Sequence, residues 1–309
     1  MQDTCKLCKQ SRKLQNSHIF PAFMWDWLKS TSRGQIRTSV SPNKLMQDGL
    51  KQPLLCHECE ELFSKWEKPF AGNVFRPLHL GETPQFGIHY EGVWALRFAT
   101  SISWRVLEWS RGQSALGHLT DIQRGLVDSA LATWAAFLLG SKDSVLPHEQ
   151  HALLLDVIED HNMDEELSPF LNRYIARTFE ANVVRAENEV LTFAKMGRFL
   201  VIGFVSPPLH REAWQGTRVR MKRGTFGGTN ITAPYALAKF MNERASKTAS
   251  FLNTLSPRQR ARDRALIDSW GDKLAETDSF RAILYDVKHS GAAALAVEDN
   301  NLPTEDTKK

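Results

Sequence analysis

Long apolar runs are missing from this sequence of 309 residues. No stretch approaches the roughly 20 apolar residues that a membrane-spanning helix needs, so we expect no membrane partner. The first residues, MQDTCKLCKQ, are polar and lack the apolar segment of a secretory signal, which predicts a cytoplasmic protein. The glycine-rich stretch TFGGTN is not followed by Gly-Lys-Ser or Gly-Lys-Thr and therefore predicts no phosphate-binding loop. Internal repeats and low-complexity tracts are also lacking.

Cysteine is scarce, with four residues in the whole sequence, and all four fall into two Cys-x-x-Cys pairs: Cys5 with Cys8, and Cys56 with Cys59. Reduced thiols are the rule in the cytosol, whereas two thiolate pairs can complete a tetrahedral zinc site with ligands at about 2.3 Å. Four sulfur ligands leave no open position, so the pattern predicts a structural zinc ion. A redox dithiol, four unrelated thiols, or His57 in place of one cysteine are the alternatives.

Excess charge is also small. The formal net charge of +4 allows contact with a polyanion without requiring it. Basic residues nevertheless gather in two short stretches, each of which is either a solvated face or a contact for a polyanion: Arg218, Arg220, Lys222 and Arg223 in the first, and Arg258, Arg260, Arg262 and Arg264 in the second.

The arrangement of breakers and apolar patterns predicts an α+β protein. We expect a zinc-binding module over 1–70, an irregular linker over 71–91, where glycine and proline recur, a mainly helical domain with a small antiparallel sheet over 92–290, and a disordered tail over 291–309.

Hydrophobic spacing places the elements of the larger domain. Apolar residues at helical spacing predict helices over 93–109, 121–139 and 147–161. Three runs rich in Val, Phe, Ile and Leu within 180–205 predict antiparallel strands joined by tight turns, and the alternating stretch 217–222 predicts another strand. Helical patterns return over 233–254, 257–275 and 278–288.

The sequence around the two cysteine pairs resembles that of a known family. Ser17-His18-Ile19-Phe20-Pro21 follows the first pair, and LLCHECEELFSKWEKPF contains the second. Over about residues 3–70 this pattern resembles the HNH endonuclease family, a ββα-metal fold of treble-clef type. The resemblance implies a zinc-bound ββα module that hydrolyses DNA phosphodiester bonds with Mg²⁺ or Mn²⁺. It further implies His18 as the general base and Glu60 as a ligand of the catalytic ion.

The sequence departs from the family in three places. Ser17 stands where the family usually has a metal ligand, and Glu60 replaces the final histidine. The stretch before the second cysteine pair has no asparagine to orient the histidine, although Gln52 or Asn43 could stand in. His18 could therefore serve only as a hydrogen-bonding residue, and Glu60 could simply belong to a solvated helix start.

The family resemblance also predicts which molecules the protein binds. DNA is the expected partner and RNA a further one, with Lys13, Arg33, Lys51 and Lys65 as the candidate contacts. Residues 92–290 could bind a protein partner, in a bacterial defence context that fold-level analogy suggests. The alternative function is a catalytically degenerate, zinc-dependent module that binds nucleic acid or protein. Arg105, within the apolar stretch SISWRVL, is expected to extend its charged end to solvent or to pair with an acid, and reaching the cleft of the module is a further alternative.

Overall fold

The computed structural model describes residues 3–32, 36–38, 41–80, 84–158, 166–186, 188–269, 271, 275 and 277–294. The chain forms two compact units. Unit 1 comprises Met1–Leu28, Asp48–Asp156 and Arg177–Leu237, and unit 2 comprises Lys29–Gln47, Val157–Ala176 and Ala238–Lys309. Each unit thus combines stretches of the predicted N-terminal module with stretches of the predicted larger domain.

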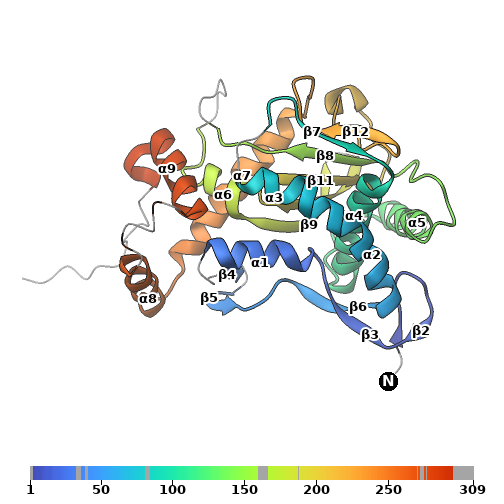
Figure 1. The fold of residues 1–309 in the computed structure, drawn as a ribbon, viewed down its shortest axis with the longest axis horizontal. Coiled ribbons are helices and arrows are strands. Elements are labelled where there is room, and N and C mark those ends of the chain that lie inside the picture. Colours follow the sequence, from blue (N-terminus) through green and yellow to red (C-terminus); the bar gives the residue numbers. More distant parts are fainter. Residues whose placement is uncertain are drawn as a thin grey trace, which may run out of the picture. The chain divides into compact units, whose positions relative to one another are not determined.

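The N-terminal part of unit 1 is a strand pair followed by a helix (Figure 1). Strand β3 (Leu14–His18) pairs antiparallel with β6 (Lys51–Cys56), and α2 (His57–Phe70) begins directly after β6. Two short strands, β1 (Asp3–Thr4) and β2 (Ser11–Arg12), pair on either side of the first cysteine pair. Helix α1 (Ala22–Thr31) follows β3 and belongs to this unit as far as Leu28.

The segment 71–91 is not an irregular linker in its described part. After α2 the chain continues through a π-helical turn, η1 (Ala71–Phe75), into α3 (Arg76–Leu80), and residues Ile88–Glu91 form strand β7. Pro77, the second residue of α3, has no N–H to donate to the preceding turn, so the hydrogen-bond ladder is interrupted where η1 joins α3. Buried Phe70, Val74 and Phe75 hold this turn against the core, so packing overrides the breakers.

A four-stranded antiparallel sheet forms the core of unit 1, in the order β8-β11-β10-β9. The strands are β8 (Gln150–Leu154), β9 (Phe179–Ala186), β10 (Glu189–Met196) and β11 (Phe199–Phe204). The strands predicted within 180–205 are therefore confirmed, whereas the helix predicted over 147–161 is wrong. Residues 150–154 instead pair with β11, because a short apolar run does not distinguish a buried strand from a helix by periodicity.

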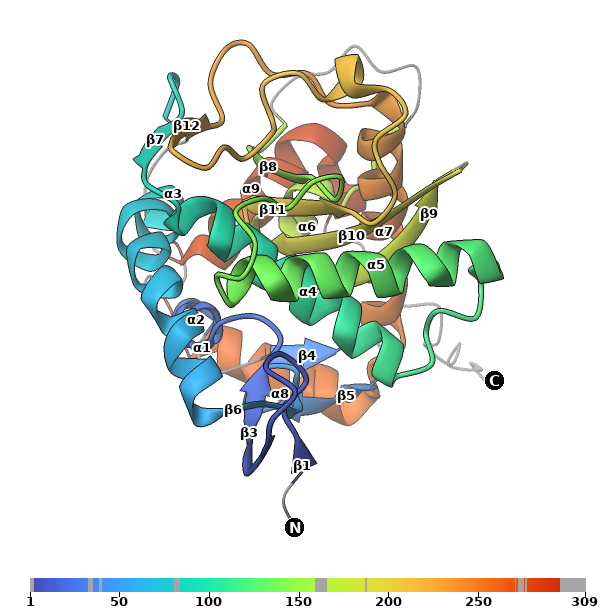
Figure 2. The ribbon, with the colours of Figure 1, turned by 90° about the vertical axis from the view of Figure 1, so that its right-hand side faces the viewer.

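Helix α4 (Trp94–Gly112) is the central helix of unit 1, and it confirms the helix predicted over 93–109. It packs against all four strands of the sheet, against α2 and against α5 (Asp121–Leu138), which Figure 2 shows running beside it. This explains why α4 is buried on nearly every side. The helix predicted over 121–139 is likewise confirmed, and it begins at a capping box formed by Thr120 and Gln123.

Strand β7 pairs antiparallel with β12 (Arg223–Phe226), at the end of unit 1 that carries the first basic stretch. The strand predicted over 217–222 is not formed there. Arg218 makes only an isolated bridge to His151, and the ladder with β7 starts at Arg223. A short helix, η2 (Arg211–Trp214), precedes this segment and buries Trp214 against the sheet.

Unit 2 consists of a hairpin and helices: β4 (Ile36–Thr38), β5 (Ser41–Met46), α6 (Leu171–Arg177), α7 (Tyr235–Asn253), α8 (Pro257–Asp268), α9 (Asp278–Ser290) and η4 (Gly291–Ala294). The last three α-helices agree with the helical patterns in the sequence. Arg173 binds buried Asp286 at 2.6 Å, and Arg37 binds Asp263 at 2.7 Å. The predicted tail lies outside the described residues beyond Ala294. No helix of the described chain has both the length and the apolar character that spanning a membrane requires.

Candidate metal centre and the His18 cluster

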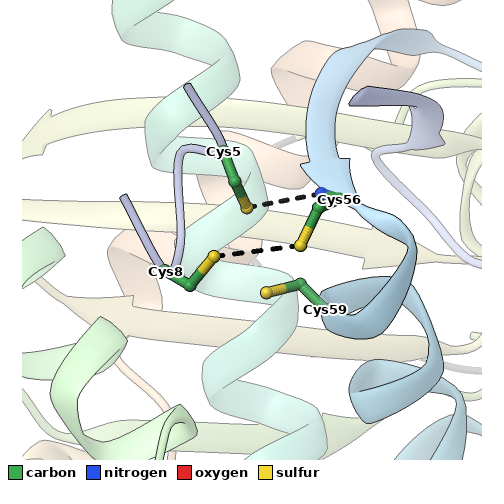
Figure 3. A group of neighbouring side chains, drawn as sticks. All are labelled: Cys5, Cys8, Cys56 and Cys59. Atoms are coloured by element: carbon green, nitrogen blue, oxygen red, sulfur yellow. Dashed lines mark hydrogen bonds between the residues drawn. The ribbon is translucent and has the colours of Figure 1, made fainter. Parts of the chain in front are cut away.

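The four cysteines of unit 1 lie close together, one pair on a turn and the other where a strand joins a helix (Figure 3). Cys5 and Cys8 come from the turn between β1 and β2, Cys56 ends β6, and Cys59 lies in the first turn of α2. Their sulfur atoms all lie within 4.8 Å of one another, and the Cys8 and Cys56 sulfurs are 3.8 Å apart. A tetrahedral ion with sulfur ligands at about 2.3 Å requires sulfurs about 3.8 Å apart, so the group can hold zinc.

The backbone holds this arrangement in place. The Cys5 N–H donates to the Gln10 carbonyl, and the Lys9 N–H donates back to the Cys5 carbonyl, which closes the first turn with Lys9 at a φ of 60°. The Lys6 N–H donates to Leu54 of β6, and the Cys56 N–H donates to the Cys5 sulfur at 3.3 Å. The two cysteine pairs are thus brought together by main-chain hydrogen bonds to β6.

The protonation of the thiols also favours a cation. A hydrogen bond from Cys59 lowers the pKa of Cys5 to about 4, while the same bond, together with burial, raises the pKa of Cys59. Burial raises the pKa of Cys56 to about 11. One thiolate is therefore stabilised by protons on its neighbours. A metal ion on the cysteines would take the place of those protons.

His57 does not join the cysteines. Its side chain is 69% exposed, and its Nε2 lies 3.4 Å from Glu61 one turn further along α2. Among the described residues, the metal-competent group in this region consists of the four cysteines. Beside them Arg12 forms an ion pair with Glu58. The main-chain N–H of Glu58, together with Arg12, lowers the pKa of Glu58 to about 2.

His18 lies at the end of β3 and is held by an acid that the sequence did not single out. Its Nε2 donates to Asp48 Oδ1 at 2.9 Å, and Lys51 binds the other oxygen of Asp48. Partial burial raises the pKa of Asp48, but hydrogen bonds from His18, Lys51 and the Gly49 N–H outweigh it and hold that pKa well below its ordinary value. Asp48 is therefore a fixed carboxylate beside the imidazole.

The short segment between β5 and β6 places Asp48 there. The ladder opposes His18 to Lys51 and continues with the Ile19 N–H donating to the Leu50 carbonyl, and Asp48 lies two residues before Leu50. A side chain at Gly49 would lie 2.0 Å from the indole of Trp25, which explains why this segment needs glycine. The residues proposed as stand-ins for asparagine are not His18 partners here. Asn43 instead binds Thr254 and Ser256 within unit 2.

Arg105 reaches the same end of the strand pair from α4. Its guanidinium donates to the His18 carbonyl at 3.2 Å and to Glu67 Oε1 at 2.8 Å, while its side chain is only 2% exposed. The ring of Phe63 lies 5.1 Å from the guanidinium carbon. The expectation that Arg105 pairs with an acid is thus confirmed, and it joins β3, α2 and α4 at one point.

Glu60 lies at the other end of the strand pair. Cys56 is opposite Leu14, four positions along β3 from His18, and Glu60 follows one turn later in α2. In the described structure no hydrogen bond joins Glu60 to His18, and its Oε1 is buried without a hydrogen-bond partner. Glu67, not Glu60, is the α2 acid that Arg105 links to His18.

The predicted nucleic-acid contacts are spread over the module. Lys13 and Lys65 are exposed, Lys51 is half-buried and bound to Asp48, and Arg33 lies outside the described residues. The functional candidate that sequence reasoning missed is Asp48, whose only signal in the sequence is the Asp48-Gly49 pair before a predicted strand.

We found no match to the chain among known family models, curated proteins or solved structures.

Proposed function

We propose that unit 1 carries an HNH-like endonuclease site that hydrolyses DNA phosphodiester bonds, with a structural zinc ion on the four cysteines. The hydrogen bond between His18 and Asp48 carries this proposal. Because Nε2 donates to the carboxylate, Nδ1 keeps the lone pair that can take a proton from water. Asp48 thereby selects the tautomer that a general base requires, and it supports the positive charge that develops on the ring.

The surroundings fit this role. Lys51 binds the second oxygen of Asp48, and Arg105 fixes the main chain of His18 from the buried side. A divalent ion, Mg²⁺ or Mn²⁺, would supply polarisation of the phosphate and neutralise the leaving oxygen. Glu60, at the cysteine end of the strand pair, does not share a site with His18, so the ion would need ligands nearer the imidazole than Glu60.

Nicking of supercoiled plasmid DNA by the full-length protein tests the proposal. Zinc-loaded protein is expected to nick DNA when Mg²⁺ or Mn²⁺ is added. His18→Ala is expected to lower the rate about 10²- to 10⁴-fold, the usual contribution of a general base. Asp48→Asn should also slow cleavage, because an amide does not stabilise the protonated ring.

Two controls make this test decisive. His210→Ala removes an exposed imidazole, 68% exposed and paired only with Glu212 in the described chain, and should leave the rate unchanged. Every variant is checked by mass spectrometry for one zinc ion per chain. If His18→Ala keeps full activity with zinc in place, His18 is not the base, and if the wild type cleaves nothing, the nuclease proposal fails.

A second candidate is a nucleic-acid-binding module without chemistry. Lys13 and Lys65 favour it, because both are exposed basic side chains of the cysteine-bearing part of unit 1. This candidate expects DNA or RNA binding that weakens steeply with salt, a smaller salt slope in Lys13→Gln and Lys65→Gln, and no cleavage with any divalent ion. A protein partner through residues 92–290 and a defence role stay predictions.

A further inference from the structure

A basic cavity of about 640 Å³ lies beside β7 and β12 in unit 1. Three arginines of the first basic stretch line it, namely Arg218, Arg220 and Arg223, whereas Lys222 in the same stretch does not. Small-molecule sites commonly have volumes of about 300–1,000 Å³. These three arginines are therefore more than a solvated face, because they line a concave site that is large enough for a small-molecule ligand.

The positive charge of the cavity is only partly neutralised. Arg220 and Arg223 make no ion pair with any described residue. Arg218 lies 3.5 Å from Glu149, whose other oxygen is already bound by Arg211 at 2.7 Å. Glu91 is the carboxylate in the lining, across the ladder from Arg223. The arginines therefore outnumber the acids, as an anion site requires.

The remaining walls suit a flat group with a phosphate. Gly227 and Gly228 line the cavity with φ values of 77° and 108°, and a side chain at Gly227 would lie 2.7 Å from Leu154, so this wall has room only for glycine. Phe86, 71% exposed, lines the same cavity and supplies an aromatic ring. An exposed phenylalanine beside unpaired arginines is an arrangement that binds a planar base and its phosphate together.

A smaller cavity of about 320 Å³ adjoins the first, because Arg218 and Arg220 line both. Gln150 also lines it, with its side chain only 1% exposed and its Nε2 without a hydrogen-bond partner in the described structure. A buried donor left without an acceptor is costly, and a ligand oxygen would satisfy it. This observation is independent of the charge on the arginines.

We infer that the larger cavity, of about 640 Å³, binds a nucleoside phosphate. The phosphates would bind to Arg218, Arg220 and Arg223, and the base would lie against Phe86. The site goes beyond the proposed nuclease function, since it uses none of the residues at the cysteine centre or around His18.

Calorimetric titration of the full-length zinc-loaded protein with ATP, GTP and inorganic pyrophosphate tests the inference at low salt. Arg220→Gln and Arg223→Gln are expected to weaken nucleotide binding about 10- to 100-fold each, because each removes charge-assisted hydrogen bonds. Lys222→Gln removes the same charge from the same stretch but outside the lining, and should change binding by less than about twofold. Phe86→Ala should weaken ATP and leave pyrophosphate unchanged.

Several outcomes would overturn the inference. Absence of ATP and GTP binding at millimolar concentration would do so, as would an equal loss in Lys222→Gln, which would indicate unspecific attraction. Pyrophosphate that binds as tightly as ATP, with no effect of Phe86→Ala, would contradict the contact with the base. A single-stranded oligonucleotide that binds through the arginines when nucleotides do not would identify a nucleic-acid surface instead. The titration involves no cleavage, so its failure is separate from failure of the nuclease proposal.

Discussion

His18 is fixed twice, by its side chain and by its main chain. Asp48 accepts from the ring at 2.9 Å, and Arg105 donates to the carbonyl at 3.2 Å. The first contact comes from the turn before β6, and the second comes from α4. Position and tautomer of the imidazole are therefore set by separate parts of unit 1, so they can be perturbed separately.

The turn at Gly49 offers one such perturbation. Gly49→Ala places a methyl group 2.0 Å from the Trp25 indole, whose Nε1 donates to the Phe20 carbonyl and which is 4% exposed. We expect the free energy of unfolding to fall by about 1–3 kcal/mol, as for other overpacked sites. Urea unfolding followed by tryptophan fluorescence measures this loss.

Gly117→Ala is the matched control, since a side chain there meets nothing within 4 Å. The carboxylate of Asp48 should also move away from His18 in Gly49→Ala, which an altered imidazole chemical shift in NMR spectra would report. Wild-type stability together with an unshifted His18 signal would show that the indole is not what requires glycine at this turn.

At the same scale, the sequence could predict the cysteines but not Asp48. Four cysteines in two pairs have few chemical uses, so their type and spacing suffice. Asp48 has no such signature, because any turn before a strand can contain Asp-Gly. Its contact with His18 depends on the register of β3 and β6 and on the fit of Gly49 against Trp25, which only the folded chain defines.

At the scale of elements, Arg105 is the residue that joins α4 to the strand pair and to α2. Arg105→Met keeps most of the apolar volume but leaves Glu67 and the His18 carbonyl without their donor. Removing one partner of a buried ion pair typically costs about 3–5 kcal/mol. Because Glu67 is 20% exposed, we expect a loss near the lower figure in urea unfolding of the zinc-loaded protein.

The control for this variant is Arg124→Gln in α5. Arg124 pairs with Asp121, a side chain that is 96% exposed, so its replacement should cost less than about 1 kcal/mol. Equal losses in the two variants would contradict the special position of Arg105 between three elements.

Elements with a local signature were predictable, and those defined by distant contacts were not. Helix α5 has both an amphipathic pattern and a capping box, and the strands β9 to β11 are apolar runs divided by tight turns. Strand β8 depends on pairing with β11, far along the chain. The helical continuation over 71–80 depends on burial of its aromatic residues, which outweighs glycine and proline in the sequence.

At the scale of the whole molecule, two buried histidines of unit 1 are held neutral. The Nδ1–H of His79 donates to the Phe75 carbonyl, and its Nε2 accepts from the Arg198 N–H. Protonation of Nε2 would break the second hydrogen bond. Burial lowers the pKa of His79 to about 3 and that of His151 to about 4. Both values lie below the value of about 6.5 that histidine has in an unfolded chain.

Stability should therefore fall on acidification. Above pH 6.5 both states hold the imidazoles neutral, whereas below it only the unfolded chain takes up protons. Each depressed pKa then costs about 1.4 kcal/mol per pH unit, or about 2 kcal/mol for each histidine between pH 6.5 and 5. Urea unfolding at a series of pH values measures the slope.

His79→Gln isolates one histidine from any loss of zinc in acid. The variant is expected to be less stable at pH 7.5 but to lose about 2 kcal/mol less than the wild type between pH 6.5 and 5. His118→Gln, at an exposed site, should keep the wild-type slope. Identical slopes in all three proteins would mean that His79 is protonated in the folded chain.

The position of the cysteine pairs has a consequence for the order in which the protein is made. Cys59 is the last of the four cysteines in the chain, so a zinc ion on this group would have all its ligands once that residue leaves the ribosome, before α4 and the four-stranded sheet are complete. The apolar face of α2, with Phe63, Trp66 and Phe70, then waits for α4 to cover it. Metal capture would thus precede burial of the core during biosynthesis, and the bound ion would hold the first strand pair in register for the helix that follows.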